Sequence, residues 1–113
     1  MKYIRIIPSL LLYNKSLVKG KNFKDHKNVG NPETICKALE SQGADEFFLI
    51  DLASYRNEKK FDFETLKKIS ENISTPITVG GGLQSFEEVK KLFNFGADKV
   101  YFSKLLYNNV ELI

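Results

Sequence analysis

Residues 76–88, PITVGGGLQSFEE, contain a short apolar segment, three consecutive glycines and a helix start. Ile77, Thr78 and Val79 are residue types typical of a buried strand. Ser85 and Glu88 have the spacing of a capping box, which places the first turn of a helix directly after the glycines. A strand that leads straight into a helix predicts a βα unit, from which parallel sheets are built.

The other segments of the chain repeat this order. Strands are predicted at residues 4–12, 46–52, 77–79 and 99–102, helices at 31–43, 63–73 and 85–96, and the first turns of a fourth helix at 105–113. Residues 13–30 and 53–62 are polar and basic and are predicted to be loops. GADE at 43–46 is echoed by GADK at 96–99, which indicates either an internal repeat or two similar turns. This pattern leaves a barrel and a doubly wound sheet open.

Composition is that of one ordinary soluble domain. The chain has 113 residues, of which 42% are hydrophobic and 27% charged, and its net charge is +3. Basic and acidic residues are interspersed, so nucleic acid is not an expected partner. No apolar run approaches a membrane span, and the single cysteine, Cys36, cannot form an internal disulfide. We expect a cytoplasmic protein with a buried Cys36 and no membrane contact.

The three glycines are the strongest candidate for a ligand site. At the carboxyl end of a parallel strand they leave backbone N–H groups unobstructed, and the next helix directs its positive end to the same place. A phosphate group fits this arrangement, although the spacing matches neither a dinucleotide fingerprint nor a Walker loop. The alternative is a turn that needs glycine only for close packing. Lys19, in the first loop, is placed to meet an anion from the same side.

Asp51 lies near the carboxyl end of the second predicted strand. Barrel enzymes place catalytic and ligand-orienting groups there. An aspartate at a strand end is also a common turn or cap residue, so both interpretations remain open.

Three charged residues lie at the opposite ends of the strands: Arg5, Glu46 and Lys99. In a closed barrel they would converge around the axis with alternating sign, which is stable because each charge has a partner. A structural ring at the barrel floor is the simplest interpretation. No metal-ligand spacing is found, so no metal and no cofactor are expected.

Several motifs together resemble a known family: RIIP at 5–8, LVKG at 17–20, Asp45 through Asp51, VGGG at 79–82, and GADKV at 96–100. They are similar to the amino-terminal half of the cyclase subunit of imidazole glycerol phosphate synthase. The resemblance implies a (β/α)4 half of a TIM (β/α)8 barrel with parallel strands, over residues 1–113. It also implies a glutaminase partner at the barrel bottom and ammonia passing through the barrel to a site at the top.

The resemblance carries roles to individual residues. It implies that Asp51 lines the site wall and that Asp98 faces the glutaminase. The charged ring becomes an ammonia gate, formed by Arg5, Glu46 and Lys99. The implied ligand is a phosphorylated small molecule, and its phosphate contacts are Lys19, Gly81, Gly82, Ser103 and Lys104. Ser103 and Lys104 replace an Asn-Thr pair of the family, which alters anion binding there without excluding it.

Leu11 departs from the family pattern, because the family has its first catalytic aspartate at this position. Leucine cannot transfer a proton, so acid–base catalysis is lost here. The run Pro8 to Leu12 resembles a divergent branch associated with surface-polysaccharide sugars, in which ammonia is delivered to a sugar amidotransferase. We expect that function first. The alternatives are a histidine-pathway cyclase and a non-catalytic phosphate-binding half-barrel.

The length is short for this fold. A (β/α)8 barrel takes about 250 residues. We therefore expect a fragment that ends within the fourth helix, or a half-barrel that pairs with a second copy or with a missing carboxyl-terminal half.

Overall fold

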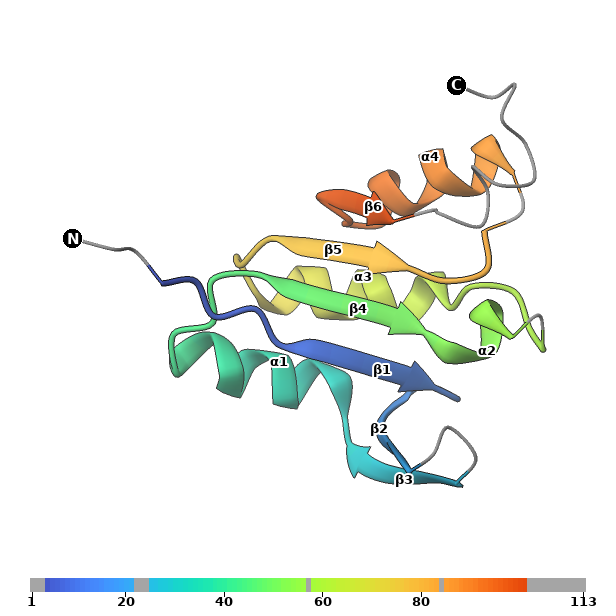
Figure 1. Cartoon of the computed structure of the whole chain (residues 1–113). Helices are drawn as coiled ribbons and strands as arrows, with labels where there is room; N and C mark the ends of the chain where they lie inside the picture. The colour runs from blue at the N-terminus through green and yellow to red at the C-terminus, as the bar shows by residue number, and fades with distance from the viewer. Residues whose placement is uncertain (1–3, 22–24, 57, 84, 102–113) are drawn as a thin grey trace.

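The computed structural model describes residues 4–21, 25–56, 58–83 and 85–101. Six strands form one sheet in the order β3-β2-β1-β4-β5-β6. The four strands β1, β4, β5 and β6 are parallel neighbours in that order. The strands β2 and β3 form an antiparallel hairpin beside β1 (Figure 1). The strands are β1 (Ser9–Tyr13), β2 (Ser16–Lys21), β3 (Asp25–Gly30), β4 (Phe47–Asp51), β5 (Ile77–Gly80) and β6 (Lys99–Tyr101).

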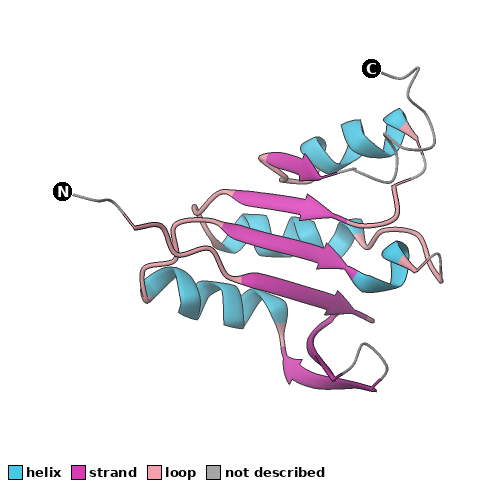
Figure 2. Ribbon diagram, viewed as in Figure 1, coloured by secondary structure: helices cyan, strands magenta, loops and turns pink. Residues whose placement is uncertain are grey.

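In the described ranges, α1 (Pro32–Ser41), α3 (Phe63–Asn72) and α4 (Phe86–Asn94) connect successive parallel strands, as the βα pattern predicts, and the short α2 (Leu52–Tyr55) precedes α3. Asn31 and Ser85 cap α1 and α4, because their side chains accept hydrogen bonds from the backbone N–H groups of Thr34 and Glu88. In Figures 1 and 2, α1 and α3 lie behind the strands. This arrangement is an α/β half-barrel. No helix in the described ranges is long and apolar enough to cross a membrane.

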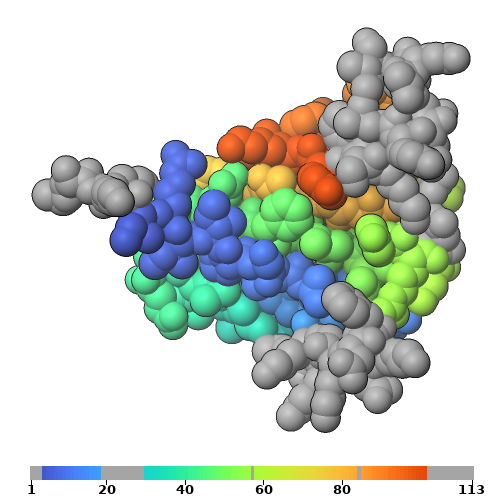
Figure 3. All heavy atoms as spheres, in the orientation of Figure 1, coloured from blue at the N-terminus to red at the C-terminus, as the bar shows by residue number. Residues whose placement is uncertain are grey.

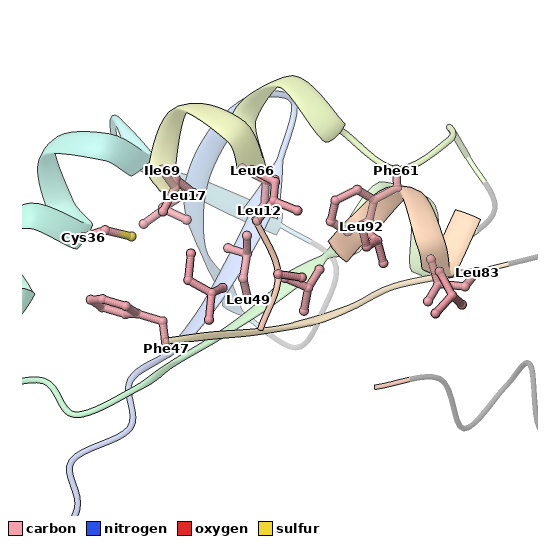
Figure 4. Packing of buried hydrophobic residues seen from close by; sticks show 14 residues of the cluster. Leu12, Leu17, Cys36, Phe47, Leu49, Phe61, Leu66, Ile69, Leu83 and Leu92 are labelled. Atoms are coloured by element: carbon pink, nitrogen blue, oxygen red, sulfur yellow. The ribbon is translucent and has the colours of Figure 1, made fainter. Parts of the chain in front are cut away.

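The sheet has two different faces. Along β4 the buried Phe47, Leu49 and Asp51 alternate with the half-buried Phe48 and Ile50. The buried set packs against the helices, and Figure 4 shows this core around Leu49 and Leu66. We call the other side of the parallel strands the open face; in Figure 3 it is turned toward the viewer.

The predicted strand at 4–12 is wrong in its first half. Residues 4–8 are irregular, and Ile4 and Ile6 are 80% and 56% exposed instead of buried. Pro8 has no N–H for a strand ladder, and none of the described elements covers these side chains. Phe93, whose position in α4 predicts a buried side chain, is also 48% exposed.

The predicted loop at 13–30 is wrong as well, because it contains the β2–β3 hairpin. Asn14 and Lys15 both have positive φ, 50° and 66°, which turns the chain from β1 back into β2. Leu17 is buried in the core and anchors this hairpin. Similarly, α2 lies within the polar connection that the sequence predicts to be a loop.

The internal echo is a repeated turn. Gly43 and Gly96 both have positive φ, 101° and 121°, at the ends of α1 and α4. The residue after each glycine donates its backbone N–H back to the helix, Ala44 to Leu39 at 3.1 Å and Ala97 to Leu92 at 3.0 Å. The two turns therefore end their helices with the same hydrogen bond.

The aspartate that follows each turn also repeats its contacts. Asp45 donates its N–H to the Ile6 carbonyl at 2.8 Å, and its carboxylate accepts the Ile6 N–H at 2.7 Å. Asp98 makes the same pair of bonds with Ile77, at 2.9 and 2.8 Å. The bonding partner is in both cases at the amino end of the neighbouring parallel strand: Ile6 precedes β1, and Ile77 begins β5. The echo is therefore a structural repeat of the αβ turn.

Replacement of the two turn glycines by alanine should therefore give different results. Both substitutions strain a positive-φ backbone, which costs about 1–2 kcal/mol. A Cβ at Gly96 would also collide with the Ser70 side chain, whereas a Cβ at Gly43 meets nothing within 4 Å. We expect Gly96→Ala to lower the free energy of unfolding by about 1–3 kcal/mol more than Gly43→Ala, in urea titrations. Equal losses would contradict the packing at Gly96.

Candidate functional site

Glu46 and Lys99 come together at the amino end of the parallel strands. The Lys99 Nζ lies 3.4 Å from the Glu46 Oε1, although β4 and β6 are separated by β5. Thr78, on the intervening strand, donates its hydroxyl to the same oxygen at 3.0 Å. The Glu46 side chain is only 14% exposed, so its charge is held in a partly desolvated position between a cation and a hydroxyl.

The other two residues predicted at this edge are placed differently. Arg5 is exposed in the irregular segment before β1 and has no ion pair with Glu46 among the described residues. Asp98 is exposed, but its carboxylate accepts the Ile77 N–H. Of the predicted gate, the structure thus brings together Glu46 and Lys99.

The glycine loop, formed by Gly80, Gly81 and Gly82, lies at the carboxyl end of β5 and packs against α2. The buried Gly82 N–H donates to the Ser54 hydroxyl at 2.9 Å. A Cβ at Gly82 would collide with the Ser54 carbonyl, and a Cβ at Gly81 would approach the Ser54 Oγ to 2.5 Å. Close packing therefore accounts for both glycines. A phosphate that takes the Gly82 N–H must replace the Ser54 hydroxyl as its acceptor.

Asp51 is directed into the protein. It is 3% exposed, and its carboxylate accepts the N–H of Ser54 at 3.2 Å and that of Asp62 at 2.8 Å. It caps the short helix α2 and holds the start of α3. Burial raises the pKa of Asp51, and the hydrogen bonds from Asp62 and Ser54 oppose that shift. The Asp51 side chain thus has the geometry of a helix cap. Of the two interpretations from the sequence, a ligand-orienting group and a turn or cap residue, this geometry matches the cap.

The open face carries uncharged residues at the level of the glycine loop. The strand register places Leu11 beside Ile50, Ile50 beside Gly80, and Gly80 beside Tyr101. Leu11 is half-buried on β1, at the position where the resemblance implies the catalytic aspartate. No carboxylate occupies this row.

The remaining predicted contacts are less defined. The backbone of Lys19 lies in β2, opposite Lys27. Ser103 and Lys104 lie outside the described residues.

A cavity of about 230 Å³ lies between the β1–β2 turn and the α2–α3 connection, lined by Lys59, Lys60 and Asp62 among others. Within the described ranges, no group of three or more His, Cys, Asp or Glu residues could hold a metal ion.

Comparison with known proteins assigns the chain to a family. The family model described as histidine biosynthesis protein matches residues 5–113. The chain belongs to the histidine biosynthesis protein family. Its relatives include the imidazole glycerol phosphate synthase subunit HisF of Flavobacterium psychrophilum, 38% identical over 109 residues. The same subunit of Thermococcus onnurineus is 35% identical over 109 residues.

Each alignment covers 96% of this chain but 43% of the relative. This member of the histidine biosynthesis protein family therefore spans less than half the length of the curated relatives it matches. The glycine loop and the Glu46–Lys99 pair both fall within the matched residues.

Two functional positions were not predicted from the sequence of this family member. Ser54 holds the glycine loop, and its position three residues after Asp51 is the spacing of a helix cap that could have shown where α2 begins. Thr78 supports Glu46 from the neighbouring strand, a contact that only the strand register reveals.

The Ser54 contact can be tested by Ser54→Ala. The substitution leaves the buried Gly82 N–H without its acceptor, which costs about 1–3 kcal/mol of unfolding free energy. Ser41→Ala is the matched control, because that exposed hydroxyl only donates to carbonyls of its own helix. A loss no larger than that of the control would show that Ser54 does not hold the loop.

Two carboxylates predict opposite pH dependence. Since the pKa of Asp51 is raised, its stability contribution is present below the ordinary value of 3.8 and is lost as pH rises through the folded pKa. Hydrogen bonds from Thr75 lower the pKa of Glu40, so its contribution is present above 4.5 and is lost as pH falls through the folded pKa. With rising pH, Asp51→Asn should gain stability relative to the unmodified chain, and Glu40→Gln should lose it. Unfolding titrations across the acidic range measure both; changes of the same sign would contradict the assignment.

Proposed function

We propose that this chain supplies the amino-terminal half of the barrel subunit of an imidazole glycerol phosphate synthase of histidine biosynthesis. The observation that carries the proposal is the Glu46–Lys99 pair at the amino edge. It lies in a chain whose relatives are named as subunits of that synthase. The subunit receives ammonia from a glutaminase at this edge and uses it at the opposite edge.

The amino edge acts as a gate. Ammonia is neutral and ammonium is charged, so a closely paired Glu46 and Lys99 leave no uncompensated negative charge to hold an ammonium ion. Asp98, on the same edge, faces the glutaminase, and Arg5 joins the ring when the barrel is closed. Removing Lys99 would leave the partly buried Glu46 carboxylate without its cation.

The carboxyl edge binds the substrate phosphate. Gly81 and Gly82 supply backbone N–H groups at the start of the segment that leads into α4, whose positive end favours an anion. At Gly82 the phosphate takes the place of the Ser54 hydroxyl as the acceptor. Ser103 and Lys104, which follow β6 in the sequence, add a hydroxyl and a charge. Lys19, whose backbone lies in β2, adds a second charge. Asp51 contributes to the wall indirectly, by positioning α2 and with it Ser54.

Leu11 favours a second function. With leucine in place of the acid–base aspartate, the same subunit would conduct ammonia to a separate sugar amidotransferase in surface-polysaccharide synthesis. Rescue of a histidine auxotroph lacking its own cyclase distinguishes the two. Growth supports the histidine-pathway function, and absence of growth despite a coupled glutaminase complex supports the amidation function.

The gate is tested in the complex of the full chain with its glutaminase. We expect Lys99→Ala to raise severalfold the fraction of glutamine nitrogen that escapes as free ammonia, with glutamine hydrolysis retained. Lys90→Ala, an exposed lysine of α4, is the control and should not change this fraction. Failure to form the complex would overturn the proposed function. An unchanged fraction in a stable complex would leave Glu46 and Lys99 only a structural role.

A further inference from the structure

The end of β6 presents an aromatic side chain on the open face. Tyr101 is 54% exposed and is the register partner of Gly80, the last residue of β5. The ring lies against Gly80, because a Cβ there would meet the Tyr101 Cδ1 at 3.5 Å and its Cβ at 3.6 Å. The Tyr101 ring therefore lies within van der Waals reach of residue 80, beside the glycine loop.

A second ring supports this position. The centroids of Phe48 and Tyr101 are 5.9 Å apart, and the ring planes are tilted by 60°. Tilted contacts of this kind are favourable because the edge of one ring meets the face of the other. Phe48 lies on β4 and Tyr101 on β6, so the pair spans β5 at Thr78 and Gly80.

The row of residues that contains Gly80 and Tyr101 is apolar beyond Gly80 as well. Leu11 and Ile50 continue the same row across the sheet. A ligand with a phosphate on Gly81 and Gly82 would thus find an aromatic and aliphatic surface next to its phosphate. Binding sites commonly combine one such surface with a few polar groups that fix orientation.

We infer that Tyr101, seated over Gly80 and against Phe48, is a specificity residue whose ring packs on the sugar of a phosphate ester held by the glycine loop. The inference rests on the proposed phosphate site at Gly81 and Gly82. The contact is made by the ring face, since a sugar presents apolar C–H groups to it. A phenylalanine at this position therefore retains the contact, and an alanine loses it.

The test compares two probes on the full chain by calorimetric titration. Inorganic phosphate reports on the glycine loop alone, and ribose 5-phosphate reports on the loop and the ring together. We expect Tyr101→Ala to weaken ribose 5-phosphate binding roughly fivefold to tenfold and to leave phosphate binding unchanged. Tyr101→Phe should bind both probes as the unmodified chain does. Phe93→Ala, which removes an exposed ring from the outer helix α4, is the matched control.

The outcomes separate the inference from the site on which it rests. If the unmodified chain binds phosphate, but binds ribose 5-phosphate no more tightly, the role of Tyr101 is overturned and the phosphate site stands. Equal weakening of both probes by Tyr101→Ala, with a lowered melting temperature, would show a structural role and also overturn it. If neither probe binds the unmodified chain, the phosphate site fails and the inference fails with it.

Discussion

The Asp51 carboxylate is the contact on which the carboxyl edge of the sheet depends. It is buried, has no ion pair among the described residues, and accepts two backbone N–H groups, from α2 and from the start of α3. This fixes Ser54, whose hydroxyl in turn accepts the Gly82 N–H. One desolvated charge therefore positions the end of β4, a short helix and the glycine loop together, and its hydrogen bonds offset much of the cost of burial.

The parallel strands and the three long helices could be predicted from the sequence because local signals agree there. Caps at Asn31 and Ser85, stops at Gly43 and Gly96, and short apolar runs all indicate the same elements. The β2–β3 hairpin could not be predicted, because its turn uses Asn14 and Lys15 in left-handed conformations without a glycine. Similarly, residues 4–8 are apolar without being a strand, since apolar character alone does not specify a pairing partner.

Prediction of the site was limited by what periodicity can show. The sequence pattern assigns Glu46 and Lys99 to the same end of their strands, and the two side chains do meet there. The direction of the Asp51 side chain depends on the pleat of β4 and on the position of α2. The helix α2 could not be predicted, because its segment of the chain is polar and has the composition of a loop. The role of Ser54 depends on a contact with Gly82 across 28 residues of sequence, and no local pattern reports such a contact.

The repeated αβ turn has a consequence for how the chain can be divided. Asp45 and Asp98 lie 53 residues apart in the sequence. Each closes its turn by reciprocal bonds, Asp45 with Ile6 just before β1 and Asp98 with Ile77 in β5. The boundary between one βα pair and the next is therefore made by the same pair of hydrogen bonds in both places. Such boundaries are suited to recombination, because a segment cut at one aspartate carries the bonds needed to join at the other. The half-barrel is in this sense modular, and its two joints lie directly beside Glu46 and Lys99 at the amino edge.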